Sequence, residues 1–395
     1  MKLSKLYNDL EMLMIGFAVV IFTLGYTSFS LITALYCFLK FRTIKWPYLV
    51  VILFFSILIP GTILTLWNIF ISKYDSIYTV GMLYRTRFFW IRVIFASGIF
   101  VYLYSLNYKE ILKFVYYMSI PCTVIGLLQL VSNPVKRVTM LAYEASAAGM
   151  YYLFMVPLLL EYYKVNRRHK FWVFLFIFTG LFIRSKAQIL VLPLMLLYFI
   201  FTSDNRKLKG GVIIIIVIGL LSLPFILQMD QLKGLNHFMT VLNKEGITGL
   251  TEKNQVWSTF TFRFSSFLVA LQLLGDNLFG SGFGAFHPEY IEIMISDEFL
   301  SKMTGVEIKG ALENKYYASP KSIFFDYLVS SGLFFLVPIT LIVIKFFKSN
   351  TSILIKASLY SFLLVSLMVE LSPFLVFLVI SLALFYKSKE IICKI

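Results

Sequence analysis

Long apolar runs separated by short polar stretches constrain this sequence more than any other feature. About 20 apolar residues span a bilayer as a helix, which satisfies its own backbone hydrogen bonds. Charged residues make up only 14% of the chain, against about 25% in soluble domains, so a soluble globular enzyme is excluded. The runs cover residues 12–39, 46–67, 88–106, 114–132, 145–163, 171–201, 212–228, 322–346 and 355–386.

Three of these runs are too long for a single crossing. The run 171–201 is broken by the charged turn 184–186, and the last run is broken at 370–373. The run 12–39 forms either one long tilted helix or a hairpin near 25–28. Basic residues lie on both sides of this run and prefer the cytoplasm, which favours the hairpin.

The sequence therefore predicts an all-α polytopic membrane protein with about 12 transmembrane helices and both termini in the cytoplasm. Residues 1–228 are expected to hold about nine spans and residues 322–395 about three. The net charge of +16 is then mostly an orientation signal, because Lys and Arg collect in cytoplasmic loops. Nucleic acid is not expected as a partner.

One connection, residues 229–321, is much longer than the others and is assigned to the outer face. Long loops of this kind usually carry function. Within it, apolar residues from Phe260 to Leu274 recur at helical spacing and predict an amphipathic helix that ends at Gly275. The following stretch 280–284, Gly-Ser-Gly-Phe-Gly, is interpreted mainly as a tight turn that lets two backbones approach closely. A phosphate-cradling turn is the alternative.

Several basic residues lie at outward-facing positions, where the positive-inside rule predicts few. Such cations suggest a shared anionic ligand, and the planar fork of Arg suits a diphosphate. For each residue taken alone, snorkelling or anchoring at the membrane interface is an equal alternative. The candidates are Arg137, Arg184, Lys186, Arg263 and Lys321, and Arg87 and Arg92 could add to the same face.

Acidic and histidine side chains form the second group of candidates. Glu144, Asp326 and Glu370 lie at or near outer span ends, where a carboxylate can accept a proton, pair with Arg or cap a helix. His287 follows the glycine turn and is a candidate base or substrate ligand, although loop histidines are often exposed and idle. No HExxH, DxD, Walker or GxSxG motif occurs in the sequence, so neither a metal nor another cofactor is expected.

Four stretches of the chain resemble the O-antigen polymerase (Wzy) family and the related O-antigen ligases. The segment from Arg137 to Ser146 is similar to an Arg followed by a Glu-Pro-Ser motif, and 183–186 is similar to a Ser-Arg turn. The other two stretches are 263–284 and 320–332. Together with the layout of spans and the late outer loop, the resemblance covers essentially the whole chain. Ala145 replaces the expected Pro, and Lys321 stands where a ligase would have His, which favours a polymerase.

The resemblance implies a metal-independent glycosyltransferase at the periplasmic face of the bacterial inner membrane. Such an enzyme moves a growing chain from undecaprenyl diphosphate onto another lipid-linked repeat unit and releases undecaprenyl diphosphate. A chain-length regulator and a flippase are expected partners, beside membrane lipid. The implied roles are diphosphate binding for Arg137, Arg184 and Arg263, electrostatic support for Lys186 and Lys321, and acceptor positioning or activation for Glu144 or Asp326.

Other functional classes fit part of the same pattern. A flippase for the lipid-linked unit fits about twelve spans and the positive charge. Transporters, however, usually show repeated halves with binding groups at mid-membrane, and no repeat is evident in the sequence. An O-antigen ligase and a structural scaffold in an assembly complex are the remaining alternatives. The clustered outer cations make the scaffold the weaker of the two.

Overall fold

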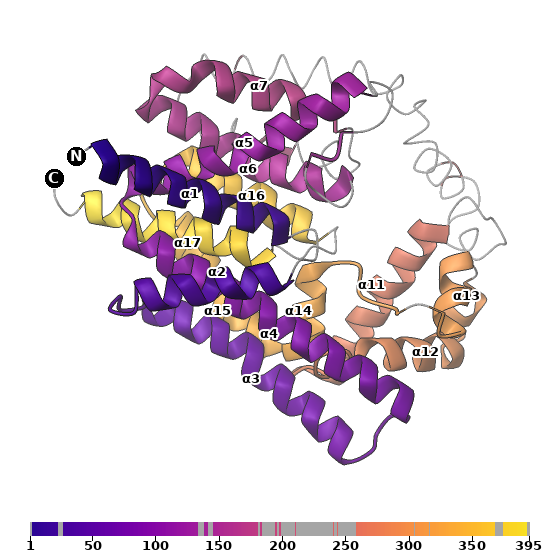
Figure 1. The fold of residues 1–395 in the computed structure, drawn as a ribbon. Helices are drawn as coiled ribbons and strands as arrows, with labels where there is room; N and C mark the ends of the chain where they lie inside the picture. The colour runs from indigo at the N-terminus through magenta and orange to yellow at the C-terminus, as the bar shows by residue number, and fades with distance from the viewer. Residues whose placement is uncertain are drawn as a thin grey trace. The chain divides into compact units, whose positions relative to one another are not determined.

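The structure is a computed structural model, and all its regular elements in the described residues are helices (Figure 1). They belong to two compact units. Unit 1 contains Met1–Val50, Ile91–Ile213 and Leu341–Ile395, and unit 2 contains Val51–Trp90 and Ile214–Thr340. The residues described are 2–22, 27–132, 138–140, 145–180, 182–183, 194–195, 197–198, 210, 240, 243, 258–303, 305–315, 317–367 and 374–392.

Three helices are long and apolar enough to cross a membrane. They are α3 (Tyr48–Phe70), α4 (Ser76–Ser105) and α5 (Tyr108–Ser132). Shorter apolar helices occur elsewhere in the described residues, among them α7 (Lys170–Gly180) and α15 (Leu333–Phe347). The chain is therefore a helical protein with membrane-spanning character, and the number of about twelve spans stays a prediction.

Unit 1 is a bundle of antiparallel and crossing helices. In the predicted run 12–39 the structure has two helices, as the hairpin interpretation expects. Small hydroxyl residues let helices approach closely, as they do in membrane bundles: Ser358 Oγ donates to Phe154 O at 2.7 Å and Ser361 Oγ to Leu153 O at 3.0 Å. Besides α5, α7 and parts of α4 and α15, the elements of the unit are α1 (Lys2–Phe22), α2 (Thr27–Lys40), α6 (Ala145–Val165), η1 (Arg167–His169), α16 (Ile353–Ser366) and α17 (Phe374–Ile392).

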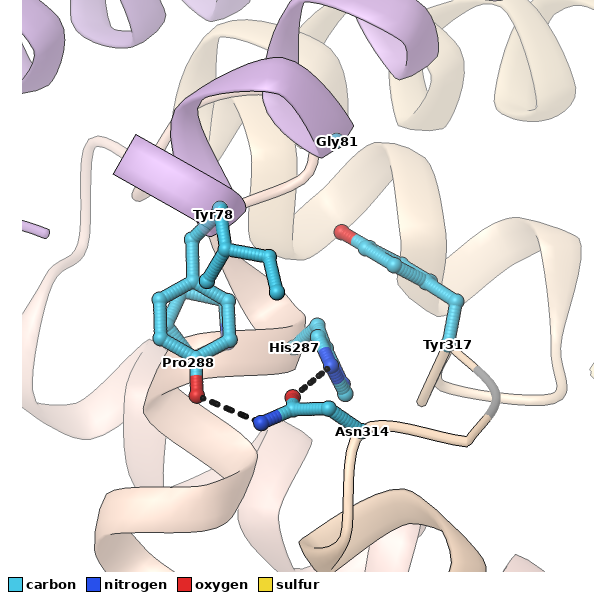
Figure 2. Close-up of a pocket in the computed structure, with 7 residues that line it drawn as sticks. Tyr78, Gly81, His287, Pro288, Asn314 and Tyr317 are labelled. Carbon is cyan, nitrogen blue, oxygen red and sulfur yellow. Dashed lines mark hydrogen bonds between the residues drawn. The ribbon is translucent and has the colours of Figure 1, made fainter. Parts of the chain in front are cut away.

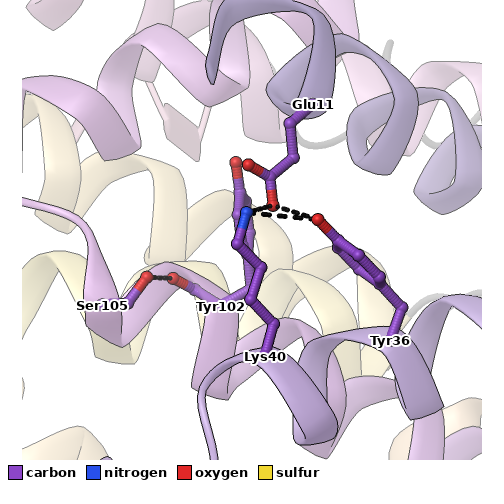
Figure 3. Close-up of polar contacts among 5 residues, drawn as sticks. All are labelled: Glu11, Tyr36, Lys40, Tyr102 and Ser105. Carbon is purple, nitrogen blue, oxygen red and sulfur yellow. Dashed lines mark hydrogen bonds and ion pairs between the residues drawn. The ribbon is translucent and has the colours of Figure 1, made fainter. Parts of the chain in front are cut away.

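Ion pairs in unit 1 join the middle of α1 to the end of α2 and to α5. Lys40 Nζ lies 2.5 Å from Glu11 Oε1, and Tyr36 Oη donates to the same oxygen (Figure 3). Lys113 pairs with Asp9. These contacts join α1 to α2 and to α5, and the orientation of the spans stays a prediction.

Unit 2 contains the described part of the long connection together with the α3–α4 hairpin. The predicted amphipathic helix is α11, and it ends at Asp276, one residue beyond the predicted end. Its buried face differs from the predicted stripe, because Phe262, Val269 and Leu273 are buried while Phe267 and Leu271 are exposed. The described helices of this connection and the following span are α11 (Ser258–Asp276), α12 (Phe286–Ser296), η4 (Leu300–Lys302), α13 (Val306–Leu312), α14 (Ile323–Ser331) and α15.

The predicted span 322–346 is broken in the structure. Helix α14 ends at Ser331, and α15 begins at Leu333, on the far side of Gly332 with φ of +55°. The apolar pattern continues through the break, so hydropathy alone does not reveal it. A second segment of the chain interrupts the helix. The N–H of Leu333 donates to Leu278 O at 2.9 Å and so does not continue the helical hydrogen bonds of α14.

Candidate functional site

The glycine turn 280–284 lies at the centre of unit 2. It packs against α3, where Phe283 N donates to Thr65 Oγ1 at 2.7 Å and Asn68 Nδ2 donates to Ser281 O at 2.8 Å. Its other side packs against the end of α14, where Ser281 N donates to Val329 O at 2.8 Å. The turn therefore joins α3 to the broken helix.

Three glycines of this turn have positive φ, and each has backbone where a side chain would lie. A Cβ on Gly280 would be 2.7 Å from Ser330 O, and one on Gly282 would be 2.7 Å from Thr65 N. On Gly284 it would be 2.8 Å from Met82 Cα. The close-approach interpretation of the sequence is thus confirmed.

The phosphate-cradle alternative needs free backbone N–H groups, and the turn does not offer them. The N–H groups of residues 280–283 donate in order to Asn277 O, Val329 O, Ser330 O and Thr65 Oγ1. The cradle interpretation is therefore wrong for these amides.

His287, on the first turn of α12, is buried and not exposed as most loop histidines are. Its Nδ1 accepts a hydrogen bond from Ala318 N at 3.0 Å, so Nε2 carries the proton and donates to Asn314 Oδ1 at 3.0 Å. Figure 2 shows His287 between Tyr78, Asn314 and Tyr317. Both ring nitrogens are used within the protein, which argues against a free general base and for a fixed neutral imidazole.

Burial lowers the pKa of His287 below its usual 6.5, and the nearby Arg85 acts in the same direction, although the hydrogen bond to Asn314 opposes both. A lowered pKa in the folded state stabilises the fold above the ordinary pKa, and this stability is lost as the pH falls through the folded value. Protonation also removes the acceptor of Ala318 N–H. We expect the apparent Tm in detergent to fall between about pH 7.5 and about pH 5. This decrease in Tm should be smaller in His287→Gln and unchanged in His169→Gln. A decrease in His287→Gln as large as in the wild type would contradict this account.

A buried carboxylate on α12 connects this helix to the α3–α4 turn. Glu289 accepts from Lys73 Nζ at 2.6 Å and also from Tyr74 Oη. Burial and the neighbouring Glu289 carboxylate raise the pKa of Tyr74, which remains a hydroxyl donor. The tip of the hairpin is thereby held against α12.

Three of the sequence-predicted site residues lie in the part of unit 2 formed by α11 and α14, which are in contact. Lys321 Nζ lies 5.1 Å from the centre of the Phe262 ring, and Arg263 is the next residue along α11. Lys321 has φ of +55°, an uncommon conformation for a residue with a side chain, directly before the N-cap Ser322. Asp326 is buried in the first turn of α14. The structure thus places Lys321 against α11, and α11 against the helix that carries Asp326.

The other predicted site residues, Arg137, Glu144, Arg184 and Lys186, lie outside the described residues, as does Glu370. Of the two further candidates, Arg87 is exposed and Arg92 is buried.

Two described residues that lie close in sequence to Arg137 and Arg184 form a hydrogen bond with each other. In unit 1, Val138 N donates to Phe182 O at 3.2 Å, which joins a residue next to Arg137 to one close to Arg184. The side-chain amide of Gln129 holds the first of these segments: its Oε1 accepts from Thr139 N and Met140 N at 3.0 and 2.9 Å.

Several residues of the site were not identified from the sequence. Gln129 lies inside an apolar run, where an amide had no evident partner. Asn314, with φ of +54°, follows α13 in a polar stretch typical of a turn. Tyr317 lies three residues further on, and its hydroxyl donates to Gly284 O. Only the Asn turn had a usable sequence signal, because the other contacts depend on tertiary structure.

The described residues contain no group of three or more His, Cys, Asp or Glu side chains that could hold a metal ion. No protein-family model, curated protein or solved structure matches the chain. A functional assignment therefore depends on the residues themselves and on their geometry.

Proposed function

We propose that this protein is a metal-independent glycosyltransferase, a polymerase of O-antigen or another surface polysaccharide. It joins repeat units carried on undecaprenyl diphosphate at the periplasmic face of the bacterial inner membrane. Undecaprenyl diphosphate is the leaving group. The protein crosses the membrane many times, with both termini in the cytoplasm.

The observation that carries the proposal is that Lys321 packs over the Phe262 ring of α11, the helix that also carries Arg263, and that α11 contacts α14, where Asp326 is buried. Arg263 and Lys321 come from positions that the sequence assigns to the outer face, where few cations are expected. Asp326 is buried in the first turn of α14. An anion at this site would be bound by charges at the outer surface, where a lipid-linked diphosphate presents its headgroup.

The proposed reaction needs a leaving group, an acceptor and a destination for one proton. The acceptor hydroxyl oxygen attacks the anomeric carbon of the donor sugar, and the bond from this carbon to the diphosphate oxygen breaks. Arg263 and Lys321 stabilise the negative charge that develops on the diphosphate. Asp326 or Glu144 accepts the hydroxyl proton, and the carboxylate also orients the acceptor.

From the sequence we also assign Arg137 and Arg184, both in unit 1, to diphosphate binding, with Lys186 in a supporting electrostatic role. The hydrogen bond between Val138 N and Phe182 O supports their pairing, because it joins the two segments that carry them. A chain-length regulator and a flippase are the proposed partners in the membrane.

A flippase is the second candidate, and the break between α14 and α15 favours it. Discontinuous helices form binding sites at mid-membrane in many transporters. In this chain, however, the break is filled by protein: Leu333 N donates to Leu278 O, and Gly282 N donates to Ser330 O at 3.1 Å. The break therefore serves packing against the glycine turn, and the polymerase is preferred.

The test is incubation of the purified full-length protein in lipid nanodiscs with one defined undecaprenyl-diphosphate-linked repeat unit, without added metal. We expect products two or more repeat units long and an equal release of undecaprenyl diphosphate. Transfer of the lipid-linked unit between leaflets without any new glycosidic bond would overturn the polymerase in favour of the flippase.

A further inference from the structure

A pocket of about 190 Å³ in unit 2 lies beside His287, at the start of α4 and α12 (Figure 2). A volume of this size holds about six waters, the scale of a single small ring with its substituents. Arg263, Lys321 and Asp326 are not among its lining residues, so it is distinct from the cation site. The lining residues are Ile77, Tyr78, Gly81, His287, Pro288, Asn314 and Tyr317.

The polar groups of the pocket form one fixed chain of hydrogen bonds. Ala318 N donates to His287 Nδ1, and His287 Nε2 donates to Asn314 Oδ1. Asn314 Nδ2 then donates to Tyr78 Oη at 3.2 Å. Because the Tyr78 oxygen accepts in this chain, its own hydrogen is left as a donor for a bound molecule. The Asn314 amide also has a second hydrogen and a second lone pair.

The walls of the pocket are apolar and rigid. The Tyr317 ring is 4.6 Å from the His287 ring and 4.5 Å from the Arg85 guanidinium, and its hydroxyl is fixed on Gly284 O. The Tyr78 ring packs edge-on against His287 at 5.6 Å. Such a site loses little entropy when a ligand binds, since its side chains are already held in place.

We propose that this pocket binds one neutral sugar ring of the repeat unit. A pyranose presents apolar C–H faces to aromatic walls and hydroxyl groups to fixed amide and phenol groups, which is the combination found here. None of the described lining residues carries a charged side chain, so an acidic sugar would lose its hydration without a direct ion pair to the lining. The choice of sugars as the ligand class rests on the proposed function, whereas the binding itself needs no diphosphate.

A blocking substitution tests the proposal with little risk to folding. Gly81 lies inside α4, and a Cβ there would be 3.7 Å from Tyr317 Cε2, an ordinary contact. Gly81→Leu extends further into the pocket, while both Leu and Ala favour a helix over Gly. Gly81→Ala is the graded comparison, because its single methyl group occupies much less of the pocket than a Leu side chain.

A second pair of variants removes one hydroxyl. Tyr78→Phe keeps the ring in the wall and deletes the proposed donor, which should weaken sugar binding about tenfold, the value of one net hydrogen bond. Tyr84→Phe is the control, since Tyr84 is an exposed tyrosine of the same helix and does not line the pocket.

Binding is measured by saturation-transfer NMR on the full-length protein in nanodiscs. The probes are D-glucose, D-galactose, D-mannose, N-acetyl-D-glucosamine and, as the acidic comparator, D-glucuronate. We expect at least one neutral sugar to bind the wild type and Gly81→Ala, and glucuronate to bind more weakly. Gly81→Leu should abolish the signal.

Absence of binding by every neutral sugar, or equal binding in Gly81→Leu, would overturn the pocket assignment. This result is separate from the polymerase test, because free sugars carry no lipid diphosphate. Sugar binding without polymerisation would leave the pocket assignment in place and refute the proposed reaction.

Discussion

Arg263→Ala is expected to slow polymer formation by about 10²- to 10³-fold, the usual cost of removing one fixed group that stabilises developing negative charge. Cells that depend on this variant should carry single-repeat lipopolysaccharide in place of a ladder. The physical reason is that the diphosphate departs with a charge that no metal is proposed to offset. The measurement is the ladder on a gel, with the rate of undecaprenyl diphosphate release in nanodiscs.

Two controls separate this role from a general loss of charge or fold. Lys309→Ala removes a cation from the same connection, but its side chain is 78% exposed and pairs with Glu313 on the surface, so normal ladders are expected. Arg263→Lys keeps the charge and loses the planar fork that binds two oxygens at once, so an intermediate rate is expected. A normal ladder in folded Arg263→Ala would refute the assignment of Arg263.

Helical class and membrane character were accessible from the sequence, because they depend on composition and on the length of apolar runs. The existence of α11 was accessible in the same way. The face that it buries inside the protein was not: Phe267 and Leu271, two residues of the predicted stripe, are exposed, whereas Phe262 and Val269 are buried. Packing partners decide which face is buried, and those partners come from α12 and α14, at a distance along the chain.

The site shows the same limit. Charges predicted to face outward can be found by their exception to the positive-inside rule, and this rule selects Arg263 and Lys321 as candidates. The pocket beside His287 could not be found in this way, because Tyr78, Asn314 and Tyr317 are uncharged and belong to no motif. Only tertiary contacts bring these side chains together. The distribution of charged residues can be read from the sequence, whereas a hydrogen-bond network of neutral side chains can be recognised only in the folded structure.

Gly332→Ala is expected to lower the stability of the protein strongly. Gly332 has φ of +55° and ψ of −137°, a region almost reserved for glycine. A Cβ there would overlap Leu278 O and the backbone of Phe279, which cannot move without breaking the bond from Leu333 N. Backbone strain and overlap together should cost about 2–5 kcal/mol.

The expected result is a drop of about 2–6 °C in the apparent Tm of the purified protein, measured by intrinsic fluorescence in detergent. Gly275→Ala is the matched control: it lies inside α11, and a Cβ there would meet nothing within 4 Å. It should leave the Tm unchanged or raise it slightly, because Ala favours the helix. If both variants shifted the Tm equally, the break at Gly332 would be tolerant of side chains, and the glycine turn could not be what interrupts the span.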